Sequence, residues 1–193
     1  MKPQRQRNYL LTQKKDPEEI VTALHKLFKI DEQNIHSGKE HYFDTFDWRL
    51  YRQALTFYTT QNELKLRRLG GSVIHSLKGC SASQYFWWDL EPSSLADELK
   101  KCIEMRALLP LVKMNYSVRT FRVMNRDRKT TVRIALRKDT AENLQRIKEL
   151  PGVLTIHEIR GYEKQFQKVV RACEKIGLEF DENNISPLAR AFE

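Results

Sequence analysis

The sequence predicts an α+β protein in which a mostly antiparallel sheet carries helices packed on its outside. Three observations lead to this fold class. Short segments with strand composition recur between residues 55 and 160. Two longer segments near the ends of the chain place apolar residues at helical spacing. The dipeptides Gln61-Asn62 and Gly70-Gly71 separate neighbouring strand signals, as hairpin turns do.

Four helices are predicted from spacing and capping signals. The first covers residues 17–29, where Asp16 can cap the N-terminus and an apolar stripe follows. A second long helix is predicted within residues 161–177, between two glycines. Shorter helices are expected around residues 94–104 and 140–150.

The strand signals fill the middle of the chain. They lie at residues 55–60, 63–69, 72–77, 82–90, 116–124, 129–138 and 153–160. No internal repeat, low-complexity tract or Pro/Gly-rich linker interrupts them. We therefore expect residues 1–193 to form one domain.

The strand at residues 129–138 alternates strictly between two kinds of side chain. Basic and polar residues form one face and apolar residues the other: Lys129, Thr131, Arg133 and Arg137 against Val132, Ile134 and Leu136. The basic face can point to water, or the sheet can close on itself with the basic residues inside. Alternation alone favours the first interpretation but satisfies both.

Composition points to a polyanionic partner. The chain carries 34 Lys+Arg against 25 Asp+Glu, a net charge of +9, which favours nucleic acid, an anionic membrane or phosphate chains. The sequence shows neither a membrane-spanning run nor a signal peptide. Three widely spaced cysteines without a CxxC motif fit a reducing cytoplasm.

One stretch, YFDTFDWRLYRQAL from Tyr42, resembles the CYTH domain, the fold of triphosphate tunnel metalloenzymes. The order of elements agrees over nearly the whole chain. The segments MRALLP, IRGYEKQF and ISPLAR, with an Asn-x-Asp-x-Lys turn at Asn125, are most similar to CYTH domains that precede a CHAD domain. The chain is then either a CYTH-like domain by itself or the N-terminal part of a longer CYTH-CHAD protein.

The resemblance implies an eight-stranded antiparallel tunnel-like β-barrel lined by Lys and Arg. These cations would bind triphosphate or inorganic polyphosphate, and carboxylates in the same tunnel would hold Mg²⁺ or Mn²⁺ for a triphosphatase reaction. Several cations in a low-dielectric bore attract a phosphate chain far more strongly than they would in water. The implied phosphate-binding residues are Lys14, Lys65, Arg67, Lys78, Arg119, Arg122, Lys129 and Arg133.

Two details of this basic set remain open at the level of sequence. The pair Lys65 and Arg67 depends on aligning LKLRRL with the family's basic strand, and LTFYTTQ could take that place instead. Arg119 and Arg122 differ by three positions, so at most one of them can face inward on a regular strand.

The acidic half of the family pattern is largely missing. Where the family's first strand has Glu-x-Glu-x-Lys, Leu10 and Thr12 stand before Lys14. A leucine cannot ligate a metal and a lone hydroxyl is a poor ligand for Mg²⁺. Glu158 on a late strand, and the acids Asp89 and Glu91, are the weak metal-ligand candidates that remain.

These departures predict a phosphate-chain binder in which hydrolysis is weak or absent. The alternative is an active Mg²⁺- or Mn²⁺-dependent triphosphatase. A third option, nucleic-acid binding, is unfavoured because the sequence has no helix-turn-helix, zinc finger or ribonucleoprotein motif. The aromatic stretch HYFDTFDWRLYRQ is interpreted as a structural corner, with Asp47 capping a short helical turn.

Overall fold

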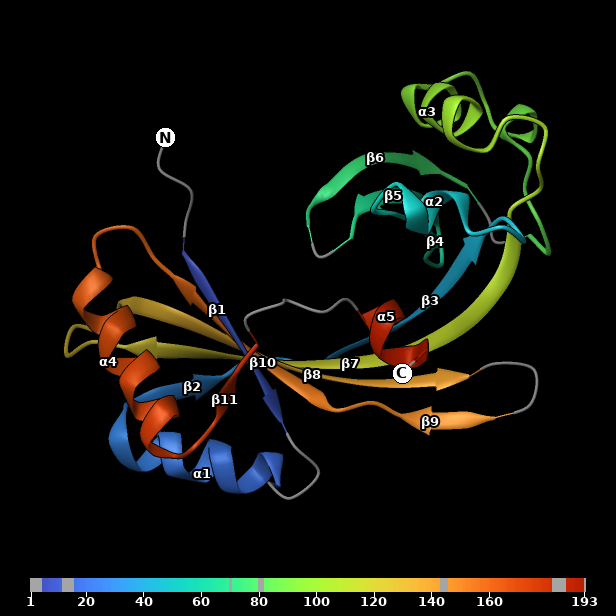
Figure 1. Ribbon diagram of the computed structural model, residues 1–193. Coiled ribbons are helices and arrows are strands. Elements are labelled where there is room, and N and C mark those ends of the chain that lie inside the picture. Colours follow the sequence, from blue (N-terminus) through green and yellow to red (C-terminus); the bar gives the residue numbers. More distant parts are fainter. Residues whose placement is uncertain are drawn as a thin grey trace. The chain divides into compact units, whose positions relative to one another are not determined.

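The computed structural model describes residues 5–11, 16–69, 71–79, 82–142, 146–181 and 187–192 (Figure 1). Its strands are β1 (Gln6–Leu11), β2 (Ile30–Glu32), β3 (His36–Asp44), β4 (Leu55–Thr59), β5 (Glu63–Arg68), β6 (Val73–Lys78), β7 (Leu109–Met124), β8 (Thr130–Glu142), β9 (Ile147–Glu149), β10 (Gly152–Glu158) and β11 (Glu179–Phe180). Its helices are α1 (Pro17–Leu27), α2 (Arg49–Arg52), the 3₁₀ turn η1 (Trp87–Asp89), α3 (Ser94–Ile103), α4 (Glu163–Lys175) and α5 (Pro187–Phe192).

The chain divides into two compact units, each built from three segments. Unit 1 comprises residues 1–37, 117–139 and 150–184, and unit 2 comprises residues 38–116, 140–149 and 185–193. The long strands β3, β7 and β8 contribute residues to both. Every strand pairing for which a register is defined is antiparallel, and the strand order in the described residues ends at β11 and at β6.

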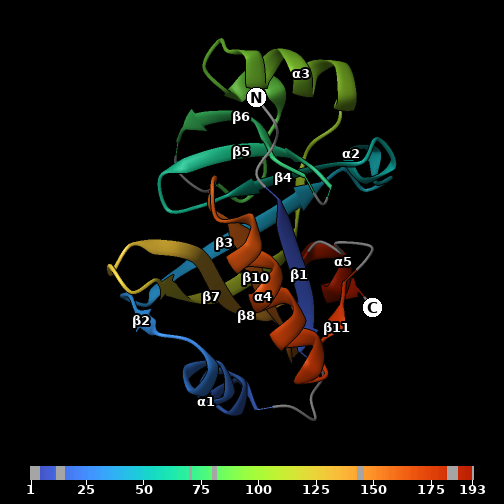
Figure 2. The same cartoon turned by 90° about the vertical axis from the view of Figure 1, so that its left-hand side faces the viewer.

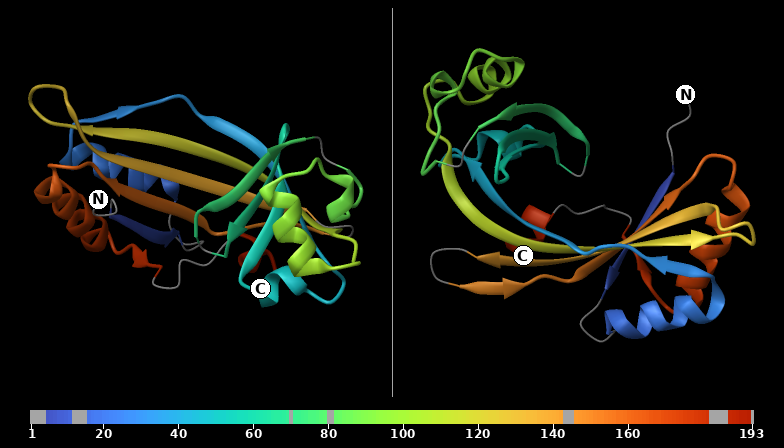
Figure 3. Two further views of the ribbon diagram at one scale, coloured as in Figure 1. Left: turned by 90° about the horizontal axis from the view of Figure 1, so that it is seen from above. Right: turned by 180° about the vertical axis from the view of Figure 1, so that it is seen from behind.

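In unit 1, helices α1 and α4 lie next to each other against one face of the sheet (Figures 2 and 3). The core combines the apolar stripes of both helices with alternate residues of the strands, among them Tyr9, Ile134 and Ile156. Asp16 caps α1 by accepting a hydrogen bond from the Glu18 N–H at 3.0 Å, as predicted. The side chains between the core positions therefore belong to the opposite, helix-free face.

In unit 2, helix α3 covers one face of strands β4, β5 and β6 (Figure 2). Phe43, Phe57 and Leu66 alternate into this second core, where they meet Leu95 and Leu99 of α3. Ser93 caps α3 through a hydrogen bond from the Ala96 N–H at 3.3 Å. The intervening positions of the same strands lie on the face that α3 does not cover.

Two element predictions are wrong. The helix expected at residues 140–150 is the end of β8 and the short strand β9, which pair with each other. The strand expected at residues 82–90 is reduced to one bridge between Tyr85 and Leu108, followed by η1. In both places strand pairing or side-chain capping outweighed the local composition.

The aromatic corner after β3 is structural, as predicted, but its cap differs. The buried carboxylate of Asp44 accepts hydrogen bonds from the backbone N–H groups of Thr45, Leu50 and Tyr51 at 2.7–3.0 Å. Asp47, the predicted cap, instead forms ion pairs with Arg49 at 3.2 Å and Arg106 at 3.3 Å. Asp44 can cap α2 because the chain turns back over the end of β3.

Candidate functional site

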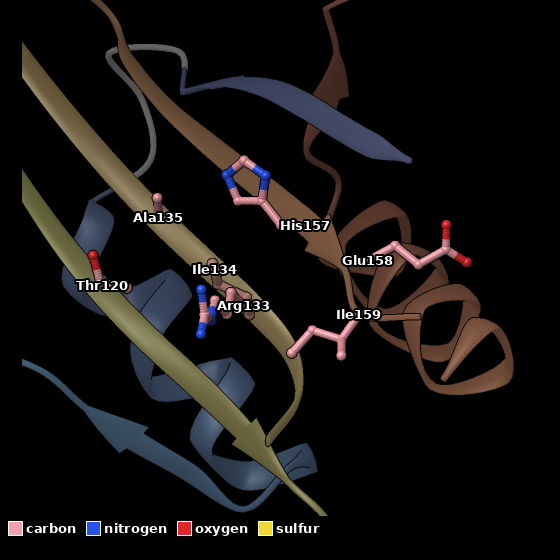
Figure 4. A pocket seen from close by; sticks show the side chains of 7 residues that line it. All are labelled: Thr120, Arg133, Ile134, Ala135, His157, Glu158 and Ile159. Atoms are coloured by element: carbon pink, nitrogen blue, oxygen red, sulfur yellow. The ribbon is translucent and has the colours of Figure 1, made fainter. Parts of the chain in front are cut away.

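The helix-free face of unit 1 carries a cavity of about 430 Å³. Figure 4 shows Thr120 of β7, Arg133 of β8 and His157 of β10 around it. Arg133 and His157 are direct cross-strand partners, so their side chains share this face. Together the three side chains offer hydroxyl, guanidinium and imidazole groups to an anion.

The exposed imidazole of His157 is electrostatically coupled to Arg133. Partial loss of hydration and the positive charge of Arg133 both lower the pKa of His157 below its usual value. His157 is not among the candidates that the sequence suggests, because it has no histidine partner at metal-binding spacing. The alternation of residues 153–160 was the signal that could have placed it opposite Arg133.

Strand β1 presents Gln6, Asn8 and Leu10 on the helix-free face, because Tyr9 and Leu11 are in the core. Leu10 stands at a position where the family pattern has an acid. Thr12 and Lys14 lie outside the described residues. The corresponding residues of β10 are Val153, Thr155 and His157. In the described parts of β1 and β10, this face thus carries no carboxylate.

The two other unit 1 arginines of the predicted set are in ion pairs. Arg119 binds Glu32 through two hydrogen bonds of 2.8 and 3.2 Å and also contacts Glu18 of α1. Arg122 pairs with Asp31, its cross-strand partner on β2. The two arginines lie on opposite faces of β7, as their spacing predicted. Arg119 stacks against Phe121 on the core side, and Arg122 is on the other side. Lys129 is exposed beside the turn.

In unit 2, the face that α3 does not cover is basic. Lys65 lies opposite Tyr58, Arg67 opposite Thr56, and Lys78 opposite Glu63. Lys65 and Arg67 therefore share a face, which is what the LKLRRL alignment required. Lys65 forms an ion pair of 2.6 Å with Glu63, and this hydrogen bond raises the pKa of Lys65.

Arg67 differs from the other cations of the set. Its guanidinium packs over the Tyr58 ring, 5.2 Å from the ring centre, and its Nε and Nη2 atoms are buried. Neither nitrogen has a hydrogen-bond partner among the described residues, and the same is true of the buried Thr56 hydroxyl on the neighbouring strand. Buried polar groups without partners cost free energy, so their clustering marks a place that a ligand or water can satisfy.

The metal-ligand candidates do not converge. Glu158 points away from His157, toward the side of α4, and accepts a hydrogen bond from the Arg5 N–H at 3.2 Å (Figure 4). Asp89 accepts a hydrogen bond from the Phe86 N–H at 3.0 Å within η1, and Glu91 is exposed beyond it. Across the described ranges, no group of three or more His, Cys, Asp or Glu side chains could hold a metal ion. These residues do not fit Mg²⁺ or Mn²⁺, which need several oxygen ligands.

Comparison with known proteins gives structural likeness only. No family model and no curated protein matches the sequence. A proposed adenylate cyclase from Bacillus halodurans aligns with a TM-score of 0.58 and 12% identity over 98% of this chain and 97% of that one. A proposed adenylyl cyclase from Hippeastrum, with a dominant triphosphatase activity, aligns with a TM-score of 0.50 and 11% identity over 99% and 97%.

At such identities the likeness establishes the fold alone. The alignments cover both structures almost completely, and the antiparallel sheet with its external helices agrees with the α+β fold that the CYTH resemblance implied. Within the described residues the sheet has eleven strands and its order ends at β11 and at β6, so the closed eight-stranded barrel is not observed. The chain therefore has the antiparallel α+β fold of triphosphate-tunnel type.

Proposed function

We propose that this chain binds triphosphate or inorganic polyphosphate through its basic strand faces, with hydrolysis weak or absent. The fold is shared with a protein that has triphosphatase activity, and the net charge of +9 favours an anionic ligand. In unit 1 the phosphate chain is bound by Arg133. In unit 2 it is bound by Arg67, with Lys65 and Lys78 on the same face.

The single observation that carries the proposal is that two nitrogens of the Arg67 guanidinium, Nε and Nη2, have no hydrogen-bond partner among the described residues. Its buried Nε and Nη2 lie beside the equally unsatisfied Thr56 hydroxyl. An arginine presents two parallel N–H donors that match two oxygens of a phosphate group. A phosphate oxygen seated there would supply the missing acceptors and offset the buried charge.

Weak or absent hydrolysis is supported by the helix-free face of unit 1. There Leu10 of β1 stands where the resemblance leads us to expect an acid, and its neighbours on that face (Gln6, Asn8, Thr155 and His157) are not carboxylates either. Without a carboxylate from the described parts of β1 or β10 to hold a divalent cation, a water molecule lacks the activator that the resemblance implies. The chain's own residues then bind and orient the phosphate chain without cleaving it.

An active Mg²⁺- or Mn²⁺-dependent triphosphatase is the second candidate. The observation in its favour is the fold shared with the Hippeastrum protein. The metal-binding acids of such an enzyme would have to include residues other than Glu158, Asp89 and Glu91, or residues that the structure does not describe.

One experiment separates the two. Calorimetry would measure binding of tripolyphosphate and long-chain polyphosphate with and without Mg²⁺ or Mn²⁺, and phosphate release would be assayed in the same samples. We expect binding without metal and no turnover. Metal-dependent phosphate release would establish the triphosphatase instead, and no binding under any condition would overturn both candidates.

The proposed partners and compartment rest on the sequence. A CHAD-type domain is proposed as a partner from the resemblance alone, and the cytoplasm from the cysteine pattern. Among the described residues, no helix is both long and apolar enough to cross a membrane. The runner-up ligand, nucleic acid, would show as binding of oligonucleotides in the same calorimetric assay.

A further inference from the structure

Unit 2 contains a second cavity, of about 400 Å³, that the proposed phosphate site does not use. It is lined by Gly38, Lys39 and His41 of β3, and by Thr59, Thr60 and Gln61 at the end of β4. His41 and Thr59 are direct cross-strand partners. A volume of this size lies within the range of pockets that bind small ligands.

The cavity is on the other side of the sheet from the basic face. His41 and Thr59 alternate in register with the core residues Phe43 and Phe57, whereas Lys65 and Arg67 oppose Tyr58 and Thr56. The strands themselves therefore separate the two places. A ligand in the cavity would not touch the Arg67 guanidinium.

The charge around the cavity is positive. Burial lowers the pKa of His41, and the ammonium groups of Lys113 and Lys39 lower it further, while Glu142 acts in the opposite direction. Two cations thus act on this imidazole against one carboxylate. Both lysines are exposed and can turn toward an incoming ligand.

The cavity also offers hydrogen-bond donors suited to an oxyanion. Lys39 provides an ammonium group and Gln61 a side-chain amide. The Thr60 hydroxyl already donates to the Glu63 carbonyl at 3.4 Å, which holds the turn that carries Gln61. An anion with several oxygens can accept from Lys39 and the Gln61 amide together, while Lys113 adds a positive charge near His41.

We propose that this cavity is a separate binding site for a small phosphate-bearing anion, such as inorganic phosphate or a phosphomonoester. Lys39 and Lys113 supply the charge, and His41 with Gln61 orients the oxygens. The site is independent of the triphosphate-binding function proposed for the opposite face.

Solution NMR with inorganic phosphate as the probe tests this assignment. Phosphate is titrated against potassium chloride at equal ionic strength, and backbone amide shifts are followed. We expect saturable shifts at residues 38–41, 59–61 and 113 that persist in the Arg67→Ala variant. The pKa of His41 should rise in phosphate, because a bound anion offsets the two ammonium groups that lower it.

Variants give the second arm of the test. Lys39→Gln with Lys113→Gln should weaken phosphate binding about tenfold, since each removes one charge contact. The matched control replaces Lys26 and Lys175, which are exposed on α1 and α4, by Gln and should change nothing. The Arg67→Ala variant should keep the phosphate response at residues 38–41.

Three results would overturn the site. These are shifts that do not saturate, an unchanged affinity in the Lys39/Lys113 variant, or loss of the response in Arg67→Ala. None of these results decides whether tripolyphosphate binds to Arg67. Conversely, failure of tripolyphosphate to bind while phosphate still perturbs residues 38–41 would overturn the proposed function alone.

Discussion

Arg119 and Arg67 both belong to the predicted phosphate-binding set, but their surroundings differ. In unit 1, Arg119 is held by Glu32 and Glu18, so its charge is already matched. In unit 2, the guanidinium of Arg67 packs over Tyr58, and its buried Nε and Nη2 have no hydrogen-bond partner among the described residues. The difference teaches that a family-like arginine is available to a ligand only where no carboxylate reaches it first.

Replacing Arg67 should have the largest effect. We expect Arg67→Ala to weaken tripolyphosphate binding about 30-fold, because a charge-assisted bidentate contact contributes about 2 kcal/mol. Its free energy of unfolding should stay constant or rise, since a buried unsatisfied charge is removed. Calorimetry and urea unfolding measure both. Arg68→Ala, the exposed neighbour, is the control; equal losses in the two variants would contradict a special role for Arg67.

A smaller loss of binding is expected at Arg133. Arg133→Ala should weaken tripolyphosphate binding about five- to tenfold and flatten its dependence on salt, since the exposed guanidinium acts through a partly screened charge. Lys129→Ala should act in the same direction. The control is Lys138→Ala, exposed on the same strand. If neither Arg133 nor Lys129 matters, phosphate chains do not use this face.

For Arg119 the comparison predicts the reverse pattern. Arg119→Ala should lower the free energy of unfolding by about 1 kcal/mol, because it breaks a bidentate pair and a contact to α1. Tripolyphosphate binding should be unchanged. Urea unfolding and calorimetry provide the two readings, with Arg171→Ala on the exposed side of α4 as the control. A large loss of tripolyphosphate binding would show that Arg119 contacts the ligand, as proposed for Arg67.

The smallest expected effect is on acid stability. Hydrogen bonds from Arg119 lower the pKa of Glu32 below its usual value. The resulting stabilisation is fully present above the unfolded-state pKa of about 4.3 and is lost as pH falls through the lower folded-state pKa. Between pH 7 and pH 3, Arg119→Ala should therefore lose about 0.5 kcal/mol less stability than the wild type in urea unfolding. If the free energy of unfolding depends on pH equally in the variant and the wild type, the Arg119–Glu32 pair contributes nothing to acid stability.

Much of the fold could be predicted from local patterns. The apolar stripes of α1 and α4 and the alternation of β5 and β8 are complete within a few residues, so the burial pattern alone assigns these elements. The helix prediction for residues 140–150 was wrong because the apolar residues there also fit helical spacing. Only the pairing of Thr140 with Glu149 favours a strand. The η1 turn at Trp87–Asp89 formed because Asp89 caps it.

The candidate site was predicted only in part. The sequence placed Lys65 and Arg67 on one face and separated Arg119 from Arg122, because both follow from the two-residue period of a strand. It could not distinguish Arg67 from Arg119, because Glu18 is 101 positions away from Arg119 in the chain and Glu32 is 87. Asp44 caps α2 in place of Asp47 although it lies only six positions before Leu50, because the turn after β3 brings its carboxylate to the start of the helix.

By itself, the sequence determined the antiparallel α+β class, the basic character of the sheet faces and the shortage of acids on β1. These properties depend on residue type and on periods of two or 3.6 residues, which neighbours along the chain define. Only the tertiary structure decided which cations are matched and which are not, and that His157 stands beside Arg133. Charge pairing acts over a few ångströms in space, and strand pairing brings together residues that the sequence keeps far apart.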